Sequence, residues 1–133
     1  MDRMIMAMIN GEERQLNYSI EVMFAMADKY GNIAKALDII QAGGKDGFEA
    51  VRWFAVQMAN DAELGRRESG HDPKPMLTLD AITPRIRPID FEILTANVVE
   101  AISLGYRREV VPEDEEVDLG LAELQAKKVT AGG

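Results

Sequence analysis

The sequence predicts a mainly α-helical domain of about four to five helices, with an N-terminal β-hairpin and an acidic, flexible C-terminal tail. Three observations support this fold class. An Asn-Gly pair near the start lies between two short strand-like runs, apolar residues then recur at helical spacing, and the composition changes after Gly105. A chain of 133 residues suits one such domain.

The hairpin is predicted from the pair Asn10-Gly11. Both central residues of a type I′ turn need φ > 0, which Asn and Gly tolerate best. Pairing outward from this turn aligns the two strands as follows: Ile9 with Glu12, Ala7 with Arg14 and Ile5 with Leu16 on one face, and Met4, Met6 and Met8 on the other. The first strand is therefore apolar on both faces.

Helical periodicity begins after Tyr18. Ser19 is a candidate N-cap for a helix ending at Gly31, and Asn32 for a second helix ending at Gly43-Gly44. We expect these two helices to bury one apolar stripe each: Ile20, Met23, Phe24, Ala27 and Tyr30, then Ile33, Ala36, Leu37 and Ile40.

A third helix is predicted to begin at Asp46, with Glu49 completing a capping box, and to run to Leu64 as the central helix. Residues 65–75 then form a loop, and Thr78 precedes a short helical turn. Pro88 suits the first turn of a last helix that ends at Gly105 and buries one face: Phe91, Leu94, Val98, Ala101 and Ile102.

The chain therefore divides into a domain of residues 1–105 and a tail of residues 106–133. Six acidic residues lie within ten positions of the tail: Glu109, Glu113, Asp114, Glu115, Glu116 and Asp118. This composition favours disorder, and a short amphipathic helix around residues 117–127 is the alternative.

The charge balance limits the classes of function. The chain has 15 Lys and Arg, 23 Asp and Glu, one His and no Cys. These counts exclude disulfides and thiol catalysis, and they disfavour His-based zinc sites and nucleic-acid binding. The apolar run of residues 4–9 is too short for a signal peptide or a membrane span. We therefore expect a cytoplasmic protein that is not an enzyme, with no cofactor, metal, nucleic-acid or membrane partner.

Three weaker motifs do not change this expectation. Gly43-Gly44-Lys45 lacks the spacing of a phosphate loop, and His71 lies in a Gly- and Pro-containing loop that gives a general base no fixed setting. Arg66, Arg67, Arg85 and Arg87 form a basic cluster without interleaved aromatic residues, which is typical of a charged loop rim.

Two apolar features are candidates for contact with another chain. Met4, Met6 and Met8 share one hairpin face, which either a helix of this domain or a partner must cover, because an isolated hairpin is marginally stable. Trp53 and Phe54 are adjacent on the central helix and point about 100° apart. Either both lie in the core or one faces a partner.

The order of elements resembles the tail assembly chaperones of long-tailed bacteriophages and related prophages. The resemblance rests on the segment from Ile9 to Leu16, the helix from Ser19 to Tyr30-Gly31, the run from Ile33 to Ile40, and the long apolar helix through Trp53. It spans roughly residues 4–105. It implies a small helical fold with a hairpin, self-association, and binding to the tape measure protein, the long helical protein around which the tail tube assembles.

The leading hypothesis is therefore a phage tail assembly chaperone that keeps the tape measure protein soluble. Its expected partner-binding or oligomer surface is made by six residues: Met4, Met6, Met8, Phe24, Trp53 and Phe54. A structural subunit of the particle, such as a minor tail or connector component, is the alternative.

Overall fold

The structure, a computed structural model, describes residues 4–107. Its elements in chain order are β1 (Ile5–Ile9), β2 (Glu12–Leu16), α1 (Ile20–Tyr30), α2 (Ile33–Ala42), α3 (Gly44–Glu68), a 3₁₀ turn (Leu79–Ala81) and α4 (Pro88–Tyr106). Four helices and a hairpin confirm the predicted fold class. The predicted acidic tail, from residue 108 onward, lies outside the described residues.

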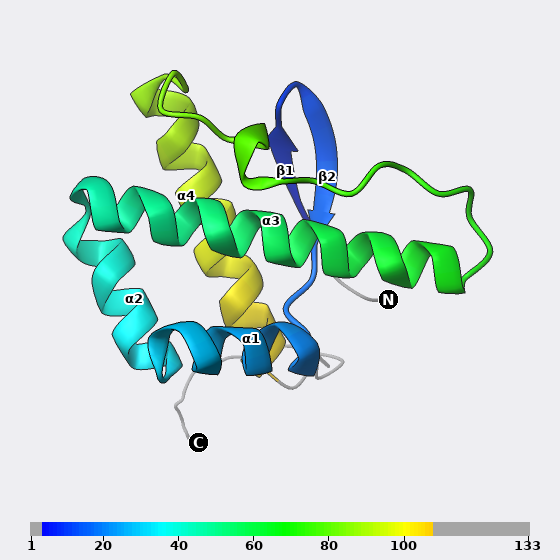
Figure 1. Cartoon of the computed structure of the whole chain (residues 1–133), viewed down its shortest axis with the longest axis horizontal. Coiled ribbons are helices and arrows are strands. Elements are labelled where there is room, and N and C mark those ends of the chain that lie inside the picture. Colours follow the sequence, from blue (N-terminus) through cyan, green and yellow to red (C-terminus); the bar gives the residue numbers. More distant parts are fainter. Residues whose placement is uncertain (1–3, 108–133) are drawn as a thin grey trace, which may run out of the picture.

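Helix α3 is the centre of the arrangement (Figure 1). It contacts α1, α2, α4, β2 and the 3₁₀ turn, while β1 packs against α4. In this view the hairpin and α4 lie behind α3, α1 runs below it and α2 closes one end. The core is built around fully buried α3 side chains, Phe54 and Met58 among them, with Val98 and Ile102 of α4. The hairpin and α4 are thus both supported by the same helix.

The hairpin has the predicted register. Ile9 pairs with Glu12, Ala7 with Arg14 and Ile5 with Leu16. Asn10 and Gly11 have φ of 54° and 80°, as a type I′ turn requires. The inner face, which includes Ile5, Ala7, Ile9 and Leu16, is buried. The turn therefore fixes which side chains of β1 share a face, and Ile5, Ala7 and Ile9 form the face that packs into the core.

The predicted caps of the first two helices are confirmed, whereas the buried face of α1 was predicted only in part. The side-chain oxygens of Ser19 and Asn32 accept the backbone N–H groups of Val22 and Lys35. Helix α1 buries Val22 and Met26. Met23 and Tyr30 of the predicted stripe pack against the core, but Ile20, Phe24 and Ala27 are exposed. The helix carries apolar residues on most sides, so spacing alone did not specify the face that contacts α3 and α2.

Both ends of α3 differ from the prediction. The helix begins at Gly44 after Gly43, without a side-chain cap, so Asp46 is a first-turn residue rather than the cap. At the other end it continues past Gly65 to Glu68. Arg66 and Arg67 pair with Glu63 three and four residues earlier, and such pairs stabilise an additional helical turn.

Residues 69–78, called here the return loop, run back along α3 to the 3₁₀ turn (Figure 1). Asn60 donates to the carbonyl of Leu77 at 3.0 Å and accepts its N–H at 2.8 Å. Arg14 and Arg67 donate to the carbonyls of Pro75 and Lys74. A loop without helix or strand is therefore fixed by polar side chains of α3 and β2.

Candidate functional site: a methionine face and an adjoining groove

The outer face of β1 is apolar and exposed. Met4, Met6 and Met8 have relative exposures of 61%, 36% and 61%. Met6 lies opposite Gln15 and Met8 opposite Glu13, so the neighbouring strand adds polar side chains to the same face. Within residues 4–107, no helix covers these methionines as completely as α3 and α4 cover the inner face. The sequence left two interpretations, in which either a helix of this domain or a partner covers this face. The exposed methionines favour the second. We call Met4, Met6 and Met8 the methionine face.

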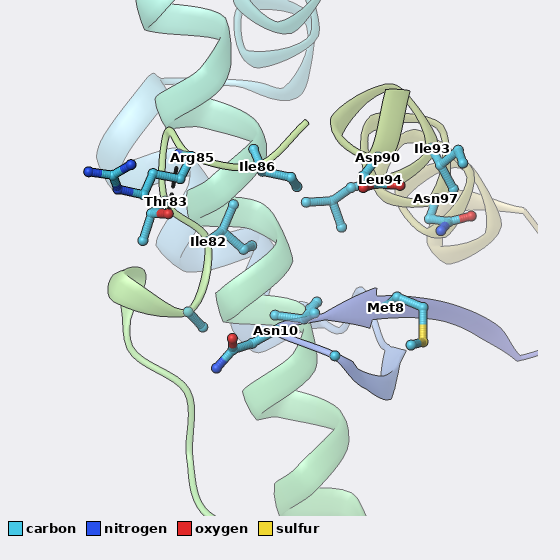
Figure 2. Close-up of a pocket in the computed structure, with 13 residues that line it drawn as sticks. Met8, Asn10, Ile82, Thr83, Arg85, Ile86, Asp90, Ile93, Leu94 and Asn97 are labelled. Carbon is cyan, nitrogen blue, oxygen red and sulfur yellow. Dashed lines mark hydrogen bonds between the residues drawn. The ribbon is translucent and has the colours of Figure 1, made fainter. Parts of the chain in front are cut away.

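Met8 also lines a groove of about 540 Å³ between the hairpin turn, the segment before α4, and α4 itself (Figure 2). The turn contributes Asn10 and Gly11 because its left-handed backbone directs the chain back at this point. The remaining lining residues are Ile9, Ala81, Ile82, Thr83, Arg85, Ile86, Asp90, Ile93, Leu94 and Asn97.

One side of helix α4 forms a wall of the groove. Asp90, Ile93, Leu94 and Asn97 follow one another at intervals of three, one and three residues, which places them on one face of a helix. Ile93 is 55% exposed, whereas Leu94 is buried in the core. In Figure 2, Ile86 and Leu94 point toward each other across the groove, with Ile82 between α3 and the hairpin turn. The groove therefore has an apolar floor and a polar rim.

A smaller crevice of about 150 Å³ adjoins the other end of the methionine face. Met4 and Met6 line it together with Ala59 and Ala62 of α3. Polar residues complete it: Glu13, Arg14, Gln15, Glu63, Arg66 and Lys74. The methionine face thus lies between a small, largely polar crevice on α3 and the groove on α4. A surface of this kind can bind apolar side chains without strict shape requirements, because methionine is flexible and polarizable.

Phe24, Trp53 and Phe54 do not join this surface. Phe54 has no exposed side-chain area, so its prediction as an interface residue was wrong; it faces inward from α3 and stacks on Tyr30 at 5.9 Å between ring centroids. Trp53 is partly buried, in edge-to-face contact with Tyr30 at 5.7 Å. Phe24 is 58% exposed, but on α1, where Ile20 is its exposed neighbour one turn earlier.

Sequence reasoning did not identify the groove. Ile93 lies outside the predicted core stripe of α4, and together with the exposed Ile89 it forms an apolar pair one turn apart. The spacing of that pair in the sequence already indicated a second apolar face on the helix. The contributions of Ile82 and Ile86 had no comparable signal, because they come from a segment without periodicity.

The strongest electrostatic feature belongs to the return loop rather than to a reactive centre. The buried carboxylate of Glu63 accepts the N–H of Lys74 at 2.7 Å, Arg67 Nε at 3.0 Å and Arg66 Nη1 at 2.7 Å. The hydrogen bond from Lys74, followed by those from Arg67 and Arg66, lowers the pKa of Glu63 from 4.5 to about 2 although burial opposes this. Glu63 is therefore a structural anion.

The weaker sequence motifs have ordinary settings. Arg66 and Arg67, half of the predicted basic cluster, are engaged with Glu63, and His71 is exposed. In the part of the chain that the structure describes, no group of three or more His, Cys, Asp or Glu could hold a metal ion. Among the helices of residues 4–107, none combines the length and apolarity that crossing a membrane requires.

We compared the chain with protein-family models, curated protein sequences and solved structures, and none of the three comparisons gave a match. The functional argument therefore depends on the methionine face and the groove.

Proposed function

We propose that this chain is a tail assembly chaperone of a bacteriophage or prophage. In this role it binds apolar helical segments of the tape measure protein in the host cytoplasm and keeps that protein soluble. The observation that carries the proposal is the methionine face: three exposed methionines on an uncharged strand, adjoining an apolar groove. The resemblance described above supports the choice of partner.

The energetics suit reversible binding. Covering the exposed parts of Met4, Met6, Met8 and Ile93 is worth on the order of 1 kcal/mol for each side chain. This favours a complex that can release its partner when tail subunits assemble around it. The formal net charge of −8 would help to keep such a complex in solution.

The proposal assigns no catalytic step to the chain, and it includes self-association. In the absence of the tape measure protein, a second copy of the chain would cover part of the same apolar surface. Self-association and partner binding would then compete, so the oligomeric state should change when the partner is added.

Co-expression with the tape measure protein of the same genome tests the proposal. We expect the full chain to co-purify with soluble tape measure protein, and a variant with Met4→Gln, Met6→Gln and Met8→Gln to lose most of this yield. The matched control is Ile20→Gln with Phe24→Gln, which removes two exposed apolar side chains from α1. Equal loss in both variants would contradict the role of the methionine face.

Mass spectrometry of purified particles separates the chaperone from the structural alternative. A chaperone is expected to be absent from finished particles or present in traces. A stoichiometric amount in the particle would instead identify a structural subunit.

A further inference from the structure

Two arginines at or beside the rim of the groove have no ion partner within residues 4–107. Arg85 lines the groove and Arg87 immediately precedes α4, and both residues are exposed. Five of the other basic side chains within residues 4–107 have carboxylate partners: Arg14, Arg52, Arg66, Arg67 and Lys74. Of the described residues that line the groove, Asp90 alone carries a carboxylate. The groove therefore combines an apolar floor with an unpaired basic rim.

The chain contains a segment of matching composition beyond Arg107. Residues 113–118 hold five acidic residues and no basic one, and three leucines follow directly: Leu119, Leu121 and Leu124. An anionic run followed by apolar side chains is complementary to a basic rim that borders an apolar groove. No other run in the sequence combines these two features in so few residues.

The connection is long enough for this segment to reach the groove. Helix α4 runs from Pro88 to Tyr106, so its rise of 1.5 Å per residue places its two ends about 28 Å apart. A chain of the length of residues 108–118 can span at most about 36 Å. The acidic run is therefore able to meet Arg87 at the start of α4. From there Ile93 lies about 9 Å along the helix, a distance that the six residues 119–124 can span.

We propose that residues 113–124 bind the groove of their own chain. The acidic run pairs with Arg85 and Arg87, and the leucines cover Met8, Ile86 and Ile93. The segment thereby shields the apolar surface until another apolar chain displaces it. This inference concerns the chain alone, so its failure would leave the proposed function intact.

Disulfide trapping in the full chain tests the proposal, because the natural sequence contains no cysteine. The test variant carries Ile93→Cys and Leu121→Cys; the control carries Phe24→Cys and Leu121→Cys. Ile93 and Phe24 are similarly exposed, at 55% and 58%. Tyr18, just before α1, contacts Tyr106 at the end of α4 from which the segment starts. Phe24 follows Tyr18 by six residues, whereas Ile93 lies about 20 Å along α4 from Tyr106. An unbound segment would thus reach Phe24 at least as readily as Ile93.

We expect the Ile93 pair to close within one chain about tenfold faster than the Phe24 pair, because binding raises the effective concentration of Leu121 at the groove. Adding Arg85→Glu and Arg87→Glu should remove this difference. Equal rates for the two pairs, or a rate that the charge reversal leaves unchanged, would overturn the proposal. A product that forms mainly between chains would also overturn it, since the groove would then belong to a second copy.

Discussion

Gly105 in the last turn of α4 lies directly against Tyr18. A Cβ atom on Gly105 would stand 2.7 Å from Cδ2 and 2.8 Å from the carbonyl oxygen of Tyr18. The hydroxyl groups of Tyr18 and Tyr106 are 2.9 Å apart. This contact joins the segment between the hairpin and α1 to the end of α4, at the opposite end of that helix from the groove residues Asp90–Asn97.

The substitution Gly105→Ala should therefore destabilise the protein by about 1–3 kcal/mol, because part of the clash is with backbone that cannot rotate away. Gly65→Ala is the matched control: it also lies within a helix, but a Cβ there meets no atom within 4 Å. Alanine should stabilise that site by about 0.5–1 kcal/mol. Urea denaturation of both variants measures the two effects, and a shift of the same sign in both would contradict the packing argument.

The hydrogen bonds to Glu63 predict a dependence of stability on pH. Because the folded-state pKa is lowered from 4.5 to about 2, the folded protein binds fewer protons than the unfolded chain between these values. The stabilisation from Glu63 is therefore complete above pH 4.5 and is lost as the pH falls toward 2. Glu63→Gln should lower the melting temperature at neutral pH and flatten its decline in acid.

Glu68→Gln serves as the control for this prediction, since Glu68 is an exposed carboxylate at the end of the same helix. Its melting curve should follow that of the natural protein across the acid range. If the melting temperature of Glu63→Gln falls in acid as steeply as that of the natural protein, the carboxylate does not hold the return loop.

Local chemistry explains which parts of the fold could be read from the sequence. Asn10-Gly11, Ser19 and Asn32 act on backbone groups within a few residues of themselves, so the hairpin register and two helix starts followed directly. The end of α3 did not, because Gly65 reads as a helix breaker unless the pairing of Arg66 with Glu63 is known.

The candidate site was predictable only in part, because most of it depends on contacts between residues that are far apart in the sequence. Alternation along β1 placed the methionines on one face, but whether a helix covers that face depends on the tertiary arrangement. The groove is harder to predict from the sequence than the methionine face. Met8 and Ile86 are far apart in the sequence and line one groove only because the hairpin and α4 pack on α3. Phe54 was misassigned because adjacent aromatic residues on an apolar helix do not reveal which one faces inward.

Asn60 should be the main attachment of the return loop to the middle of α3. Its side-chain amide donates to the carbonyl of Leu77 and accepts the N–H of the same residue, as a neighbouring backbone would. Asn60→Ala leaves both groups of Leu77 unpaired and should cost about 1–3 kcal/mol. Amide hydrogen exchange at Leu77 should accelerate accordingly. Gln57→Ala, at a partly buried position one turn earlier, should leave that exchange rate unchanged, and faster exchange in both variants would indicate a general loosening of α3.

Adjacent residues of β1 provide the sharpest test of the exposed methionine face. Ile9 is 2% exposed, so Ile9→Thr removes buried apolar volume, places a hydroxyl in the core, and should cost about 2 kcal/mol or more. Met8→Thr changes an exposed side chain on the same strand, and its effect should remain within about 0.5 kcal/mol. Denaturation midpoints compare the two variants, which introduce the same strand-compatible residue at neighbouring positions of β1. A large loss of stability in Met8→Thr would mean that Met8 is ordinary core, and the face could not then be available to a partner.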